Sequence, residues 1–170
     1  LFGAGYIVTA TFLVAIVRGG GEQVALEGWV WLVTGLAAGP SVFFWAPLRR
    51  RLGLIATFSI GCLAEAVGVA ASVLLSLPLG PFLGGILLGG TFVAVTALGL
   101  NTGRALAAQA PRRALALLTA AFGTGQIIGP VVAGYLADLS GNYTSGSLVA
   151  AAALVIAAVL AMMVRSHVPA

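Results

Sequence analysis

The sequence predicts an all-α membrane protein, on three observations: few charged residues, long apolar runs, and turn-forming residues between those runs. Hydrophobic residues make up 61% of the 170-residue chain, and charged residues only 7%. A soluble domain carries about a quarter charged residues, which form its water-facing surface. Eight basic and four acidic side chains cannot cover a domain of this size. Lipid is therefore expected to surround most of the molecule.

Six apolar stretches are each long enough to cross about 30 Å of hydrocarbon, which takes about 20 helical residues. They are predicted at residues 1–18, 28–48, 53–77, 79–101, 114–137 and 146–164. Barrel strands would be shorter and would alternate in polarity, so the long runs indicate helices. Turn-forming sequences separate them, for example Leu77-Pro78 and Ser140-Gly141-Asn142. We expect a single transmembrane domain over residues 1–170.

The arginines predict the orientation of the chain in the membrane. In a six-span serpentine, one side carries Arg49, Arg50, Arg51, Arg104, Arg112, Arg113 and Arg165, and the other carries Arg18. Cytoplasmic loops hold the excess of basic residues, so both termini are predicted to be cytoplasmic, in a cell (inner) membrane. Since these charges lie between spans, they indicate topology rather than nucleic-acid binding. With a lone Cys62 and a lone His167, no cofactor or metal site is expected.

Pairs of glycines spaced four apart predict close helix packing. Helices in lipid approach one another through small residues, and five such pairs occur. They are Gly35/Gly39, Gly80/Gly84, Gly85/Gly89, Gly99/Gly103 and Gly125/Gly129. Any single pair is about as well explained by chance in a chain rich in glycine and alanine. The five together favour a tightly packed bundle.

Two of these pairs carry a further feature that suggests an internal repeat. The pair Gly35/Gly39 is followed by Pro40, and the pair Gly125/Gly129 by Pro130. The shift of 90 residues between them corresponds to three spans, so the second copy runs through the membrane in the opposite direction. That relation predicts two inverted three-helix repeats, with the prolines as helix-kinking positions. Chance is the alternative, because the shared string is short.

Three stretches of the chain are similar to a known transporter family. They are GYIVTATFLVAIVR (5–18), WLVTGLAAGPSVFFWAPLRRRLG (31–53) and RRALALLTAAFGTGQIIGPVVAGYLADLSG (112–141). Through them nearly the whole chain resembles the C-terminal six-helix half of a major facilitator superfamily transporter of the YbfB/YjiJ-like family. The resemblance implies alternating access, with a small-molecule substrate held between this half and an N-terminal six-helix half. One departure is the loop 48–53, which lacks the acidic residue of the superfamily signature.

The resemblance also implies that spans one, two, four and five line the central cavity. The candidate substrate-binding residues are the polar ones at suitable depth: Tyr6, Thr9, Asn101, Gln126 and, at the outer end, Arg18. A polar side chain in a span needs a partner, a ligand or water. For each threonine a hydrogen bond within its own helix is favoured over a binding role. For Arg18, pairing with Glu22 or contact with lipid headgroups is favoured over binding an anionic substrate.

Glu65 is the one acidic residue deep within a predicted span. An ionised carboxylate near the bilayer centre is costly, so the group is expected to be protonated, paired or facing water. Two hypotheses follow, a proton-coupling site or a neutral glutamic acid hydrogen-bonded inside the bundle. The second is favoured, because the resemblance places the third span away from the cavity.

Three classes of function compete. A secondary active transporter is the leading hypothesis, with lipid, the N-terminal half and an unidentified small molecule as its partners. The alternatives are a non-transporting membrane scaffold or a half-sized homodimeric membrane protein. A membrane enzyme is disfavoured, because no span contains a histidine and the deep acid is unpaired.

Overall fold

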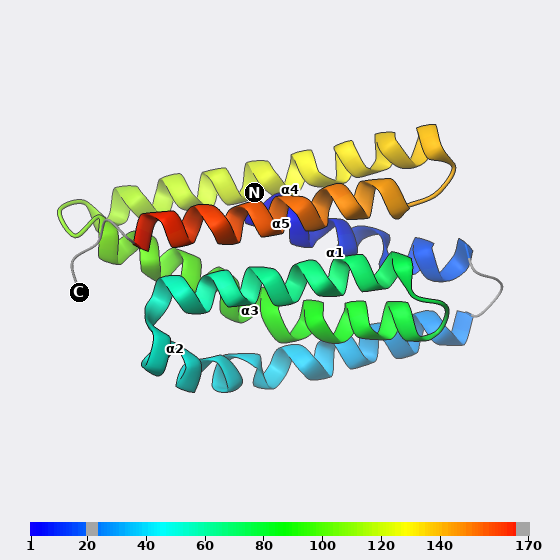
Figure 1. Ribbon diagram of the computed structural model, residues 1–170, viewed down its shortest axis with the longest axis horizontal. Helices are drawn as coiled ribbons and strands as arrows, with labels where there is room; N and C mark the ends of the chain where they lie inside the picture. Colours follow the sequence, from blue (N-terminus) through cyan, green and yellow to red (C-terminus); the bar gives the residue numbers. More distant parts are fainter. Residues whose placement is uncertain (20–23, 166–170) are drawn as a thin grey trace.

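The computed structural model describes residues 1–19 and 24–165 (Figure 1). All regular secondary structure in these residues is α-helix. The helices are α1 (Phe2–Gly19), α2 (Val24–Leu74), α3 (Leu79–Leu106), α4 (Pro111–Ser140) and α5 (Thr144–Arg165). All five are long and apolar enough to cross a membrane. The all-α prediction is confirmed for these residues. Glu22, His167 and the side chain of Arg165 lie outside the described part of the chain.

The structure contains five helices where the sequence predicted six spans, and the difference lies in α2. At about 1.5 Å per residue, its 51 residues would extend over about 75 Å, far more than the hydrocarbon thickness. The helix is broken at Gly53, whose φ of 81° and ψ of 175° are readily adopted only by glycine. Figure 1 shows the chain turning back there. We call residues 24–52 the first arm of α2 and residues 54–74 the second arm.

Replacing Gly53 by alanine is expected to destabilise the protein by about 1–3 kcal/mol, because a Cβ disfavours this backbone conformation. Gly28→Ala is the matched control, since a Cβ there would meet nothing within 4 Å and the backbone is helical. Equilibrium unfolding in mixed detergent micelles with increasing SDS measures both variants. Equal stability of the two variants would contradict a structural need for glycine at the bend.

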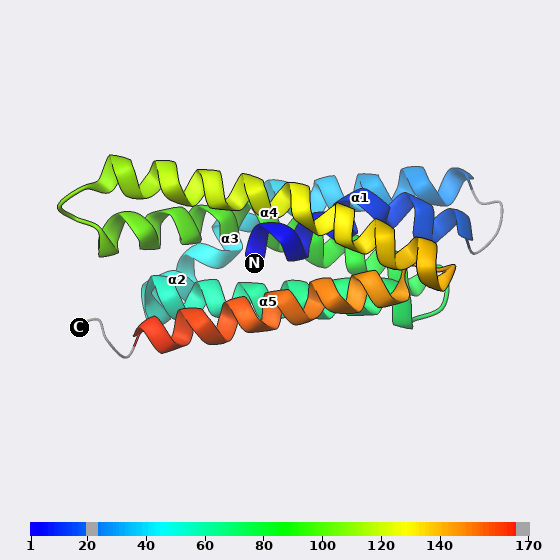
Figure 2. The same cartoon turned by 90° about the horizontal axis from the view of Figure 1, so that it is seen from above.

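Helix α1 contacts each of the other four helices. In Figure 2, α4 and the first arm of α2 lie on one side of the bundle. The second arm and α5 lie on the other side (Figure 2). Helix α3 packs against both arms, since a Cβ at Gly85 would collide with Thr34 of the first arm and one at Gly68 of the second arm with Leu87. Among the described residues α4 does not contact α2. This arrangement leaves most of the α4 surface exposed, with Gly129 and Ala133 as its buried residues.

Glycines form the closest seams between the helices. A Cβ at Gly129 would collide with the carbonyl oxygen of Ala4, so α4 lies directly on α1. A Cβ at Gly89 would likewise collide with the carbonyl oxygen of Thr34, at the seam between α3 and the first arm. The Trp45 indole also links these two elements, donating a 2.7 Å hydrogen bond to the Gly90 carbonyl. Small residues thus set the spacing of the helices, as expected in lipid.

The two glycine pairs of the predicted repeat lie in different surroundings. Gly125 packs against the backbone of Ala4 in the α1–α4 seam, as Gly129 does, and Pro130 follows within α4. A Cβ at Gly35 or Gly39 would meet nothing within 4 Å, and both residues lie with Pro40 on an exposed face of the first arm. The repeat itself stays a prediction.

Candidate functional site

A hydrogen-bonded pair of polar side chains lies near the middle of the bundle. Tyr6 on α1 is buried, with 7% of its surface exposed, and Gln126 on α4 is half-buried. The side-chain amide of Gln126 donates a hydrogen bond to the Tyr6 hydroxyl. The close approach of the helices makes this possible, since Gly125 and Gly129 flank Gln126 in the seam with α1. The structure thus brings together two of the residues predicted for substrate binding.

Aromatic rings surround the Tyr6 side chain. The aromatic cluster consists of Phe2, Tyr6, Phe58, Phe92 and Phe122, contributed by α1, the second arm of α2, α3 and α4. The Tyr6 ring stacks on Phe2 at 5.4 Å, on Phe122 at 5.7 Å and on Phe92 at 6.1 Å between centroids. Such pairs fix ring orientation as well as burying apolar area. The Tyr6 hydroxyl is therefore held in place from several sides.

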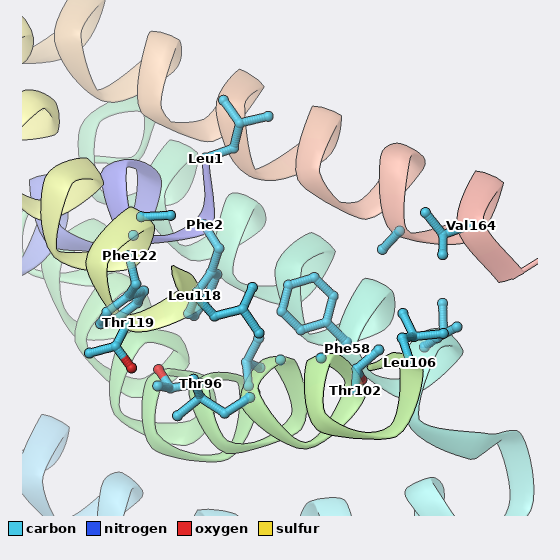
Figure 3. A pocket seen from close by; sticks show the side chains of 18 residues that line it. Leu1, Phe2, Phe58, Thr96, Thr102, Leu106, Leu118, Thr119, Phe122 and Val164 are labelled. Atoms are coloured by element: carbon cyan, nitrogen blue, oxygen red, sulfur yellow. The ribbon is translucent and has the colours of Figure 1, made fainter. Parts of the chain in front are cut away.

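A mainly apolar pocket of about 470 Å³ adjoins this cluster (Figure 3). Phe2, Phe58 and Phe122 of the aromatic cluster line it, together with residues from the last turns of α3 and the first turns of α4. Of its threonines, Thr96 donates to the Phe92 carbonyl at 2.6 Å and Thr102 to the Leu98 carbonyl at 2.8 Å. These two hydroxyls are satisfied within their own helix, so their hydrogens are not free for a ligand.

Two further predicted binding residues, Thr9 and Asn101, form no hydrogen bond with the Tyr6–Gln126 pair. Thr9 is buried, with 1% of its surface exposed, and its hydroxyl has no hydrogen-bond partner within the described residues. Asn101 is exposed on α3. Their roles in binding stay predictions.

Arg18 pairs with Glu27 at the end of the bundle predicted to be extracellular. The guanidinium Nε and one terminal nitrogen donate to the two carboxylate oxygens at 2.6 and 2.9 Å. This bidentate bridge joins the end of α1 to the start of α2. The sequence predicted Glu22 as the partner of Arg18. Glu22 lies outside the described residues, and the partner in the structure is Glu27.

Glu65 lies on the second arm of α2 and is almost fully buried, with 1% of its surface exposed. Neither carboxylate oxygen meets the geometry of a hydrogen bond with any described group. Thr91 on α3 lies opposite Glu65. A Cβ at Gly61 would collide with Val95 and one at Gly68 with Leu87, and these two contacts bracket both residues. Both roles predicted for Glu65 stay open on these contacts alone.

Four phenylalanines of the aromatic cluster were not identified from the sequence. Each lies within an apolar run, where phenylalanine is equally suited to face lipid, so composition gives no signal. The spacing of Phe2 and Tyr6, one helical turn apart, was the one available indication of a shared face. Across residues 1–19 and 24–165, no three histidine, cysteine, aspartate or glutamate side chains form a group that could hold a metal ion.

Comparison with known proteins gives one finding about the whole chain. A family model described as "Uncharacterised MFS-type transporter YbfB" matches residues 1–162, which cover α1 to α4 and most of α5. Neither a curated protein nor a solved structure gave a match.

Proposed function

The chain belongs to the YbfB-like family of MFS-type transporters, and from this premise we propose that it moves a small molecule across the cytoplasmic membrane by alternating access. The proposal depends chiefly on one observation, the Tyr6–Gln126 hydrogen bond within the aromatic cluster. Polar groups are costly at membrane depth, so a hydrogen-bonded pair of a phenol and an amide there favours a binding role. Between them, the two groups can both donate and accept hydrogen bonds.

The proposed binding site is formed by the Tyr6 hydroxyl, the Gln126 amide and the adjacent ring of Phe92. A substrate with a hydrogen-bonding group and an apolar or planar portion would suit this combination. The amide is half-buried, and the tyrosine is held rigidly by stacking, so little side-chain ordering would be needed on binding. In this proposal an N-terminal six-helix half supplies the facing wall of the cavity.

The proposed topology has six membrane crossings, with the two arms of α2 each crossing once and both termini in the cytoplasm. The bend at Gly53 supports it, because Arg49, Arg50 and Arg51 immediately precede the bend and belong at a membrane surface. In two inverted three-helix repeats, the two arms would be the second and third helices of the first repeat and would correspond to α4 and α5 of the second.

Cysteine labelling tests this topology. In a Cys62→Ser background, cysteines introduced at Arg50 and at Arg112 should react with a membrane-impermeant maleimide from the cytoplasmic side only. A cysteine at Glu27 should react from the opposite side, because the first arm would carry the chain across the membrane between Glu27 and Arg50. Labelling of Arg50→Cys and Arg112→Cys from opposite sides would exclude the six-crossing arrangement.

Transport itself is tested with the full-length protein in proteoliposomes. Uptake and efflux of a panel of labelled metabolites would be measured with and without an imposed proton gradient. Saturable, gradient-dependent movement of at least one compound is expected. A folded, correctly inserted protein that moves none of the panel, but that copurifies with a constant membrane partner, would favour the scaffold alternative.

A further inference from the structure

Glu65 is a buried ionisable group that the proposed binding site does not use. It lies on the second arm of α2, facing the interior of the bundle rather than lipid, as its 1% exposed surface requires. It faces α3, where Thr91 lies opposite it between the Gly61–Val95 and Gly68–Leu87 contacts. A carboxyl group in such a place needs a compensating partner or a proton.

No compensating cation faces Glu65 from the helices that pack on α2. From α1, the ionisable neighbour is Tyr6, while Arg18 is bound to Glu27 at the end of the helix. From α3, the sole charged residue is Arg104, which is exposed in the last turn. Residues 144–164 of α5 contain no ionisable side chain. On α2 itself the neighbour is the thiol of Cys62, one turn earlier.

The geometry of Thr91 indicates which form of the carboxyl fits. Its hydroxyl hydrogen is directed at the Leu87 carbonyl, with an oxygen–oxygen distance of 2.6 Å, and the Leu88 carbonyl follows at 3.3 Å. A hydroxyl that already donates its hydrogen can only accept a further hydrogen bond. The protonated carboxyl of Glu65 can donate to it, and the carboxylate cannot. The ionised form has no hydrogen-bond donor for either oxygen among the described groups.

We propose that Glu65 is a proton-binding site that is occupied in this arrangement and is released to water only when α3 separates from the second arm of α2. On release, the carboxyl O–H bond breaks, the proton passes to water, and the carboxylate remains hydrated. On closure, a proton is taken up again before the group is buried. By linkage, deprotonation favours the opened arrangement and protonation favours the closed one.

This inference rests on the proposed function in one respect, because a transporter must change its helix packing during its cycle. It adds the coupling ion, a proton, and the element that carries it. The second arm packs on α3, and α3 also contacts α1 and α4, so the proton and substrate sites would be coupled through α1 and α3. Tyr6 connects the two, since it is hydrogen-bonded to Gln126 and stacks on Phe92, the residue after Thr91 on α3.

Infrared spectroscopy of the full-length protein tests the protonation state directly. At neutral pH the wild-type protein should show the carbonyl stretch of a protonated carboxyl, sensitive to exchange into deuterium oxide. Glu65→Gln should abolish the band assigned to this chain, and Glu27→Gln, which changes an acid at the bundle end, should leave it. Absence of the band in the wild-type protein at neutral pH, or its loss in Glu27→Gln alone, would overturn the proposal.

Cys62 provides a second readout that does not depend on transport. Raising the pH should increase alkylation of Cys62 by a small maleimide more in the wild-type protein than in Glu65→Gln, because only the wild-type protein gains a carboxylate that draws water to this turn. Equal pH dependence in the two proteins would contradict the linkage. Failure of substrate uptake with both readouts positive would count against the proposed transport function and leave the proton site standing.

Discussion

Replacing Gly129 by leucine is expected to destabilise the protein by about 3 kcal/mol, the upper part of the range for overpacking a close-packed seam. A Cβ at this position would collide with the Ala4 carbonyl oxygen and would lie 3.0 Å from both Ala4 carbon atoms, Cα and C. These are backbone atoms, so no rotamer change can relieve the contact, and α4 must move away from α1. Unfolding in detergent with increasing SDS measures the loss.

Gly39→Leu is the matched control for this substitution. It changes the corresponding glycine of the predicted repeat, but a Cβ there meets nothing within 4 Å. Its effect on stability is expected to stay within about 0.5 kcal/mol, as for a surface position. Movement of α4 would also separate Gln126 from Tyr6, so Gly129→Leu should lose uptake in proteoliposomes. Equal stability of the two leucine variants would show that the α1–α4 seam is not as close as the structure places it.

Hydrophobicity was sufficient to predict the helices and less informative about their ends. The predicted spans 79–101, 114–137 and 146–164 lie within α3, α4 and α5, which extend beyond each of them. Helical hydrogen bonding continues past the hydrocarbon edge, because charged residues such as Arg104 are compatible with helix but not with lipid. The predicted boundary between spans two and three lies at Gly53, where one long helix changes direction instead of two helices being separated by a loop.

The candidate site was predictable one residue at a time but not as an assembly. Tyr6 and Gln126 stand out as polar residues within apolar spans, yet their pairing depends on the register of α4 on α1, which the sequence does not specify. Arg18 shows the same limit: Glu22 is nearer in sequence, but the hairpin between α1 and α2 brings Glu27 opposite the guanidinium. Local spacing predicts neighbours on one helix, and tertiary packing decides neighbours across two.

Tyr6→Phe is expected to reduce substrate uptake at least about tenfold, measured as the ratio of maximal rate to KM in proteoliposomes. The substitution keeps the ring and its stacking on Phe2 and Phe122 and removes the hydroxyl alone. A site built around a hydrogen-bonding group loses about 1.4 kcal/mol or more when that group is absent. Thr124→Ala on α4 is the control, because this exposed hydroxyl bonds to its own helix at Ala120 and should leave uptake unchanged.

The double variant Tyr6→Phe/Gln126→Leu separates binding from structural support. Tyr6→Phe leaves the Gln126 amide without its partner, which costs stability; replacing both members with apolar groups of similar shape should recover most of it. A purely structural pair would therefore regain uptake in the double variant together with stability. A substrate-binding pair would regain stability alone, because neither hydrogen-bonding group remains to meet the substrate. Recovery of uptake in the double variant would move the binding site away from Tyr6 and Gln126.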